Sequence, residues 1–304
     1  MQKRNKIELL THCDLDGIGC GVLINDSFPD ANVHFCSHRD IDKNIQRITE
    51  DTILFIADIF PHEDKSIKHL NNMAVPIFFF DHHPGAVKEL KRLYNVVQGS
   101  VVNLNYCAAV LLRNFLYRRE DKFQELVHHI NDFDANPNRN PNSIGFKLNL
   151  IMREIGIGKM YNMLKDQAAF HWRTDFDDIL KIVNKKKNNV LKKAKEIEIN
   201  NTHIIRNKNI VIFSDYQFIK FSNEIIEREN NIDLYVFIND GELAFRKGQS
   251  YSIDCQKLAE HFNGGGHPYA AGAPKPDHLL NSPRDIVEDY LLNEIDTFLS
   301  TVQD

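Results

Sequence analysis

The sequence holds few cysteines, and none of them form a closely spaced pair. Its five cysteines include no Cys-x-x-Cys motif and are scattered over Cys13, Cys20, Cys36, Cys107 and Cys255. An odd, scattered set argues against a disulfide framework and against a structural zinc site. The thiols are therefore expected to be reduced, which indicates a cytoplasmic protein.

Long apolar runs and an excess of positive charge are also missing. No run reaches the roughly 18 apolar residues of a transmembrane helix, so no association with a membrane is expected. The N-terminus, MQKRNKIELLTHCD, is basic, but its apolar stretch is too short for a signal peptide. The net charge is −5, which disfavours binding to long duplex nucleic acid. Short anionic partners remain compatible with this charge.

What is present is an ordinary globular composition spread over 304 residues, a length that predicts two domains. The first 85 residues alternate between apolar segments of strand length and segments of helix length. Continuous apolar strands separated by helices predict an α/β fold with a parallel sheet and helices on both faces. The predicted strands are 6–12, 32–38, 52–60 and 75–81, and the predicted helices are 17–26, about 41–49 and 62–72.

The rest of the chain is predicted to be helical first and α/β again later. Helices are expected from about 105 to 170, interrupted by a turn-rich loop over 132–143. A lysine-rich stretch, 174–200, predicts one long helix. It is either a basic arm for nucleic acid or, as we favour, a solvated helix joining two domains. The predicted organisation is a catalytic domain over 1–173, a linker helix over 174–203 and a smaller α/β domain over 204–304.

Acidic and histidine side chains gather at the ends of the predicted N-terminal strands. His12, Asp14 and Asp16 follow the first strand at spacings i, i+2 and i+4, so an extended chain would project them to one face. The others are Asp58 in LFIADIF, Asp81-His82-His83 after VPIFFF, and Asp132 in HHINDFD. Taken singly, each acid could be a helix N-cap, and each histidine could be a core residue that is hydrogen-bonded to a backbone carbonyl. Together, at one edge of a parallel sheet, they predict a two-metal hydrolytic site for Mn²⁺ or Mg²⁺.

Two features of the second half indicate anion binding. Gly264, Gly265, Gly266 and His267 form a GGGH sequence, which predicts a loop after a helix over 253–262. Consecutive glycines let the backbone approach a ligand and present N–H groups to an anion. Arg246, on a predicted hairpin strand, could form a phosphate fork or pair with a surface acid.

These residues carry a resemblance to a known family. THCDLDG, the Ala-Asp at 57–58, DHH at 81–83 and the Asn-Asp at 131–132 resemble the four motifs of the DHH phosphoesterase superfamily. NGGGHPYAAGA resembles the signature of its companion DHHA1 domain. The similarity covers about residues 6–135 and 205–275. Within the superfamily, HCDLDGIGCGVLI with DHHPG is most similar to the short-oligonucleotide hydrolases, the nanoRNases.

The resemblance implies two bound divalent cations, most often Mn²⁺, with Mg²⁺ or Co²⁺ as alternatives. It assigns Asp16, Asp58, His82 and Asp132 to one ion and His12, Asp14 and Asp58 to the other, with Asp58 bridging. It also implies that His83 contacts the scissile phosphate, and that Arg246 and the segment 264–267 hold the substrate. Asp58, His82 and His83 are thus the expected catalytic residues.

Two assignments have alternatives. Only Cys13 separates His12 from Asp14, whereas the nanoRNase and pyrophosphatase branches usually place three residues there. Other branches with the short spacing can leave that coordination position to water. Asp134, two residues beyond Asp132, is an alternative fourth carboxylate.

The expected activity is metal-dependent hydrolysis of short single-stranded RNA or DNA oligonucleotides to mononucleotides. The same motifs also serve phosphatases of 3′-phosphoadenosine 5′-phosphate and phosphodiesterases of linear or cyclic dinucleotides. A non-catalytic nucleotide sensor is a third interpretation, although every ligand position is filled. A homodimer is compatible with the sequence.

Overall fold

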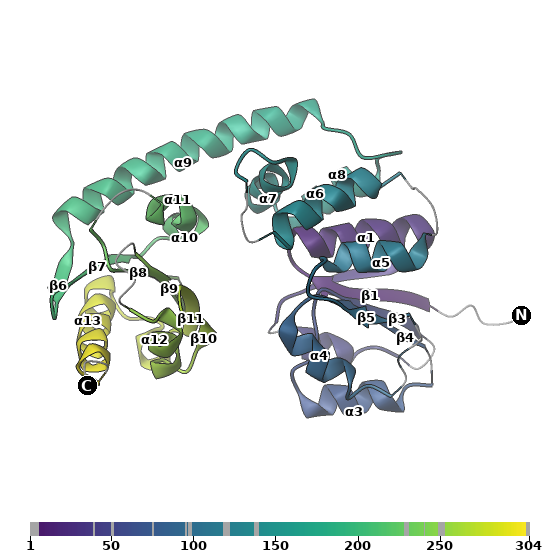
Figure 1. Cartoon of the computed structure of the whole chain (residues 1–304), viewed down its shortest axis with the longest axis horizontal. Coiled ribbons are helices and arrows are strands. Elements are labelled where there is room, and N and C mark those ends of the chain that lie inside the picture. Colours follow the sequence, from purple (N-terminus) through teal and green to yellow (C-terminus); the bar gives the residue numbers. More distant parts are fainter. Residues whose placement is uncertain are drawn as a thin grey trace, which may run out of the picture. The chain divides into compact units, whose positions relative to one another are not determined.

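The computed structural model describes residues 6–38, 40–49, 52–74, 76–94, 96, 99–117, 122–136, 140–227, 231–239, 241–248 and 253–301. The chain forms two compact units, Met1–Val183 and Asn184–Asp304 (Figure 1). The division falls inside the long helix α9 (Thr174–Asn200), whose bounds match the predicted 174–200. The predicted domain boundaries lie on either side of that division.

The first unit is built on a parallel sheet, as predicted. Its strands are β1 (Lys6–His12), β2 (Asn32–Cys36), β3 (Thr52–Ala57), β4 (Ile77–Asp81) and β5 (Val101–Val102). They lie in the order β2-β1-β3-β4-β5, and every pairing between them is parallel. The chain adds β2 on one side of β1 and then β3, β4 and β5 on the other side. The strand order therefore switches between β1 and β3. In open parallel sheets, ligands bind outside the carboxyl ends of the strands at this switch point.

Helices cover both faces of this sheet (Figure 1). One layer comprises α1 (Leu15–Ser27), α5 (Ala108–Leu116), α6 (Gln124–Asp134), α7 (Ile144–Ile155) and α8 (Ile157–Lys165). The opposite layer comprises α2 (Ile41–Ile45), α3 (Asp64–Asn72) and α4 (Pro84–Leu90). Neighbouring strand residues enter opposite cores: Phe80 packs with the first layer and Phe79 with the second. Burial on both faces explains why the strands read as continuous apolar runs.

The second unit contains a mixed sheet with the order β10-β11-β9-β8-β7-β6. The strands are β6 (His203–Ile205), β7 (Lys208–Phe213), β8 (Leu234–Ile238), β9 (Glu242–Lys247), β10 (Gly265–His267) and β11 (Ala270–Pro274). Its helical elements are α10 (Tyr216–Lys220), α11 (Ser222–Ile226), α12 (Cys255–His261), η1 (Asp277–Leu279) and α13 (Arg284–Thr301). The predicted hairpin is confirmed, since β8 and β9 pair antiparallel. Asp240, in its predicted turn, lies outside the described residues.

One local prediction in this unit is wrong. The GGGH sequence is not a loop, because Gly265–His267 forms strand β10, which pairs antiparallel with β11. Gly266 has φ +141°, a conformation that L-residues rarely adopt, and a side chain there would lie 2.6 Å from the Ala271 backbone. The glycines thus allow an edge strand to lie close to its neighbour.

All five cysteines are free, and four of them are buried. Of the helices in the described part of the chain, none is both long enough and apolar enough to cross a bilayer.

Candidate metal centre

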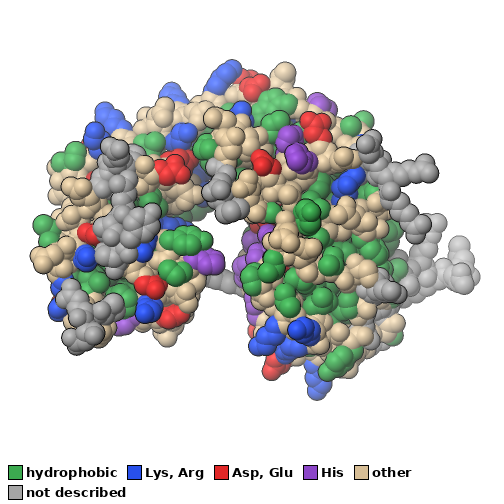
Figure 2. Space-filling view, in the orientation of Figure 1, with side chains coloured by type: hydrophobic (Ala, Val, Ile, Leu, Met, Phe, Trp, Pro, Cys, Tyr) green, Lys and Arg blue, Asp and Glu red, His purple; other side chains and the backbone are tan. Residues whose placement is uncertain are grey.

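The predicted ligands meet at the carboxyl edge of the parallel sheet, on both sides of the switch point. His12 ends β1, Asp58 follows β3, and His82 follows β4. Asp16 comes from the first turn of α1, and Asp134 from the last residue of α6. Figure 2 shows histidine side chains gathered along one edge of this unit.

The chain after β1 does not stay extended, contrary to the expectation for His12, Asp14 and Asp16. It turns at Asp14, which caps α1 by accepting a hydrogen bond from the Gly17 N–H at 3.0 Å. A Cβ atom on Gly17 would lie 1.9 Å from the His12 carbonyl oxygen, so this approach requires glycine. The turn leaves His12 Nδ1 2.8 Å from Asp14 Oδ2.

Asp16 extends from α1 into the centre, and its carboxylate is fixed by hydrogen bonds to backbone N–H groups. Its two oxygens accept hydrogen bonds from the Ala108 and Ala109 N–H groups, at 2.7 and 2.8 Å. These are the first amides of α5, whose dipole favours a negative charge there. The side chain is only 1% exposed. Asp16 is thus a buried, rigidly placed carboxylate.

Asp58 occupies a strained position. Its φ of +62° lies in the left-handed region, which costs a non-glycine residue of order 1 kcal/mol. The turn ends β3 three residues earlier than predicted and brings the carboxylate between the ends of β1 and β4. Asp58 is 1% exposed, and its Oδ2 has no hydrogen-bond partner among the described residues.

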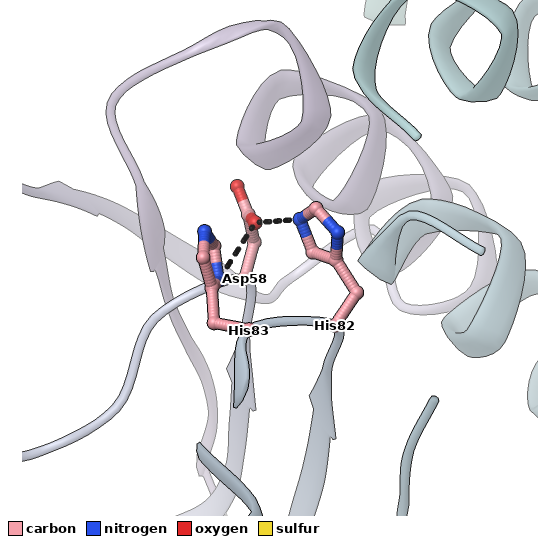
Figure 3. A group of neighbouring side chains, drawn as sticks. All are labelled: Asp58, His82 and His83. Carbon is pink, nitrogen blue, oxygen red and sulfur yellow. Dashed lines mark hydrogen bonds and ion pairs between the residues drawn. The ribbon is translucent and has the colours of Figure 1, made fainter. Parts of the chain in front are cut away.

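The DHH triplet divides into one positioning residue and two histidines that face Asp58 (Figure 3). Asp81 Oδ1 accepts hydrogen bonds from the His82 and His83 N–H groups, at 2.6 and 2.8 Å, and lies 2.8 Å from His83 Nδ1. His82 Nε2 lies 3.2 Å from Asp58 Oδ1, and His83 Nδ1 lies 4.0 Å from the same oxygen. Asp81 therefore orients the turn and one imidazole, a role that sequence reasoning missed.

Helix α6 presents Asp134, rather than Asp132, to this cluster. Asp134 Oδ2 lies 3.1 Å from His82 Nε2. Asp132 belongs to none of the ligand groups found among the described residues. Residues two apart on an α-helix point about 200° apart around its axis, so these two aspartates cannot face the same site. Asn131 belongs to the motif at 131–132, but its structural role was not predicted: its Oδ1 accepts a hydrogen bond from the Cys107 N–H and so connects α6 to the start of α5.

Three groups of side chains in the described residues bring three ligand atoms within 4.8 Å of one another. They are His12, Asp14 and Asp58; Asp58, His82 and His83; and Asp16, His82 and Asp134. The groups overlap, because Asp58 and His82 each belong to two of them. Sequence-predicted residues from four separate chain segments thus form one continuous cluster.

The cluster is electrostatically crowded. Burial raises the pKa of Asp16 to about 7, and Asp134 and Asp14 add to the shift. Burial, followed by Asp14 and Asp16, raises the pKa of Asp58 well above its usual range. Burial by itself would lower the pKa of the histidines, but the nearby carboxylates have a larger effect and raise it. The Asp14 carboxylate raises the pKa of His12 to about 10, and Asp134 and Asp16 raise that of His82 to about 9.

This arrangement fits divalent cations. Without them, buried carboxylates repel one another, and protonated His12 and His82 supply the compensating charge. Oxygen and imidazole donors suit Mn²⁺ and Mg²⁺. The unpartnered Oδ2 of Asp58 is a buried acceptor that a cation would satisfy.

In the second unit, the predicted substrate residues lie in one row across the sheet. Register pairs His267 with Ala270, Ala270 with Arg246, and Arg246 with Tyr235. Directly opposed residues share a face, so Arg246 and His267 lie on the same face, about 10 Å apart over two strand spacings. Arg246 is half-buried and donates from Nη1 to the carbonyls of Phe245 and Ala271, at 2.9 and 3.2 Å. Burial lowers the pKa of Arg246.

Comparison with known proteins supports the expected resemblance. No protein-family model matches the chain. The curated oligoribonuclease NrnB of Bacillus subtilis (strain 168) is 22% identical over 298 residues, which cover 89% of this chain and 73% of that protein.

Three solved structures share the fold. A DHH-domain protein of the S1p family of ribosomal proteins is 14% identical with a TM-score of 0.61, covering 96% of this chain and 87% of that one. The pGpG-specific phosphodiesterase PggH of Vibrio cholerae is 17% identical with a TM-score of 0.58, covering 96% and 99%. RecJ of Thermus thermophilus with Mn²⁺ is 12% identical with a TM-score of 0.58, covering 95% of this chain and 52% of RecJ. The resemblance to DHH proteins, with similarity to NrnB, is confirmed.

Proposed function

We propose that this chain is a metal-dependent phosphodiesterase that hydrolyses short oligonucleotides to mononucleotides. The observation that carries the proposal is Asp58, a strained and buried carboxylate shared by two overlapping groups of ligand atoms. Strain at a buried acid persists only where the surrounding structure compensates for it, and such positions concentrate at functional sites. The oligoribonuclease activity named for NrnB and the phosphodiesterase activity named for PggH support the choice of substrate class.

The proposed ligand sets follow the observed groups. His12, Asp14 and Asp58 would hold one cation, and Asp16, His82 and Asp134, together with the Asp58 carboxylate beside His82, would hold the other. Asp134 takes the place expected for Asp132, because it is the α6 carboxylate that lies against His82. The direct contact between His12 and Asp14 supports His12 as a ligand despite the short spacing.

In the proposed mechanism, two divalent cations would lower the pKa of a coordinated water and neutralise charge developing on the phosphate. Asp58, which belongs to two of the ligand groups, would contribute to holding both cations. Asp16 and the α5 amides behind it keep one side of the centre rigid. His83 places Nδ1 against Asp81 Oδ1, which fixes the orientation of its ring for contact with a non-bridging phosphate oxygen.

Substrate binding is proposed to involve the row across the second sheet. Arg246 is half-buried, and its acceptors among the described residues are the neutral carbonyl oxygens of Phe245 and Ala271, which leaves the guanidinium charge to be balanced by an anion. His267 lies on the same face, on an exposed strand whose glycines bring no side chains of their own. We propose that this face binds a nucleotide phosphate.

A second candidate is a phosphodiesterase restricted to linear dinucleotides. The observation that favours it is the near-complete mutual coverage with the pGpG-specific enzyme PggH. It differs from the first proposal in substrate length rather than in chemistry.

Incubation with 5′-labelled RNA and DNA of two to ten residues, in the presence of Mn²⁺, tests the proposal when products are resolved over time. Mononucleotides from two- to four-residue substrates are expected. Cleavage of the dinucleotide alone would select the second candidate. Release of inorganic phosphate without chain cleavage, or no turnover, would contradict both. An Asp58→Asn preparation serves as the control for contaminating nucleases.

A further inference from the structure

Beside the metal centre lies a row of rings that the ligand groups do not use. The ring centroids of His12 and His38 are 4.9 Å apart, and those of His38 and His62 are 5.5 Å apart. The row continues from His62 to Phe60 at 5.0 Å, and from Phe60 to His83 at 6.4 Å. We call Phe60, His62 and His38 the ring row. It lies between His12, a predicted ligand, and His83, the histidine expected to contact phosphate.

The ring row is part of a firmly held edge. His62 follows β3, in a loop whose N–H groups at 62 and 63 donate to the buried Asp42 carboxylate at 3.1–3.2 Å. A Cβ atom on Gly85, in α4, would lie 2.7 Å from the Phe60 ring, so α4 packs directly against it. His38 follows β2 on the other side of β1. The rings are therefore placed by the ends of two strands.

No hydrogen bond or ion pair among the described residues gives His38 or His62 a structural role. Both side chains are exposed, and neither imidazole makes a hydrogen bond or ion pair with any described residue. Their contacts are with other rings. Neither belongs to a ligand group in the described part of the chain. They lie beside the metal centre, because the His38 ring contacts that of His12 and the His62 ring contacts that of His38.

We propose that His38 and His62 bind the nucleobase adjacent to the scissile phosphate by stacking, an inference that rests on the proposed phosphodiesterase function. A phosphate placed between His12 and His83 would leave the base of its own nucleotide beside the ring row. Aromatic side chains bind single-stranded nucleic acid through base stacking, which tolerates any sequence because every base has a π-face. The apolar Phe60 at the end of the row favours a base over a second phosphate. The ring row thus determines that the substrate is a nucleotide rather than a simple phosphodiester.

The test compares a 5′-phosphorylated adenosine dinucleotide with two analogues that lack the base at either position, under saturating Mn²⁺. The variants are His38→Ala, His62→Ala, their combination, and His38→Phe with His62→Phe, which keep a ring. His171→Ala is the matched control, since His171 is an exposed histidine outside the ring row. Mn²⁺ affinity is measured for every variant, because His38 contacts the ligand His12.

We expect the double alanine variant to lower kcat/KM for the dinucleotide about 10-fold or more, chiefly through KM, a loss typical of one lost stacking contact. The loss is expected to be several-fold smaller on the analogue lacking the stacked base, and the phenylalanine variants are expected to recover most of it. His171→Ala should match the wild type. Equal losses on all substrates, or a matching fall in Mn²⁺ affinity, would overturn the stacking proposal alone. A wild-type protein that cleaves none of the substrates would instead overturn the proposed function.

Discussion

The two sheets of this molecule present functional side chains in different ways. The first sheet is entirely parallel, so its strand ends and the starts of several helices meet at one edge, where buried acids and histidines cluster. The second sheet is largely antiparallel, and its candidate residues lie in a row across one face. An edge rich in helix N-termini can stabilise crowded carboxylates and bind cations. A face with one arginine and a glycine strand suits an extended anionic ligand. Substitutions at the edge are therefore expected to affect chemistry, and substitutions on the face to affect substrate binding.

The largest effect is expected from Asp58→Asn. Turnover of short oligonucleotides should fall by at least about 1,000-fold, since Asp58 is proposed to hold both cations and metal assistance supplies several kcal/mol. The metal-free variant should melt no lower than the wild type, because the amide replaces a carboxyl group whose charged form is disfavoured by burial and by Asp14, Asp16 and Asp134. Activity assays and thermal melts of the metal-free proteins check both outcomes. Wild-type turnover by this variant would disprove the site.

The variants Asp134→Asn and Asp132→Asn test which of two aspartates on α6 is a metal ligand. We expect Asp134→Asn to weaken Mn²⁺ binding and reduce turnover by roughly 100-fold, as expected for a lost ligand. Asp132→Asn should stay within a few-fold of the wild type, because it belongs to no ligand group found among the described residues. Isothermal titration with Mn²⁺ and steady-state kinetics measure both. The reverse ranking would restore the ligand set expected from the family motif.

Arg246→Ala tests the face of the second sheet. KM for a dinucleotide should rise about 10-fold with kcat nearly unchanged, because a charge-assisted contact to phosphate is lost away from the reacting atoms. Arg206→Ala is the matched control, since Arg206 pairs with Asp296 at 2.7 Å and lies outside that row. A fall in kcat without a change in KM would place Arg246 in the chemical step instead.

The smallest effect concerns pH. In the metal-free protein, His12 and His82, with pKa values raised to about 10 and about 9, are protonated at neutral pH, and Asp16, with a pKa of about 7, is partly so. A cation must displace these protons, so the affinity for Mn²⁺ should rise from pH 6 to pH 9. Titrations in two buffers of different ionisation enthalpy should reveal protons released at pH 7. Affinity independent of pH would contradict the proposed ligand protonation.

Much of this architecture followed from local patterns. Uninterrupted apolar runs such as VPIFFF predicted buried parallel strands, and polar residues directly after them predicted a functional edge. Both hold because strand burial and strand polarity are local properties of the chain. The extended arrangement of His12, Asp14 and Asp16 was wrong, since Asp14 caps a helix there. The loop expected at 264–267 was also wrong, because pairing with β11 is a long-range interaction that glycine content does not reveal.

Residue types and strand polarity can both be recognised along the chain, and they predicted that acids and imidazoles would meet at the end of a parallel sheet. Which of these side chains face one another depends on how the helices and strands pack. The rotation of α6 selects Asp134 over Asp132, and the left-handed turn at Asp58 places its carboxylate between two strands. The first N–H groups of α5 donate hydrogen bonds to the Asp16 carboxylate, although they lie more than 90 residues away in the sequence. Such choices depend on how helices pack and rotate against the sheet, which no short stretch of sequence specifies.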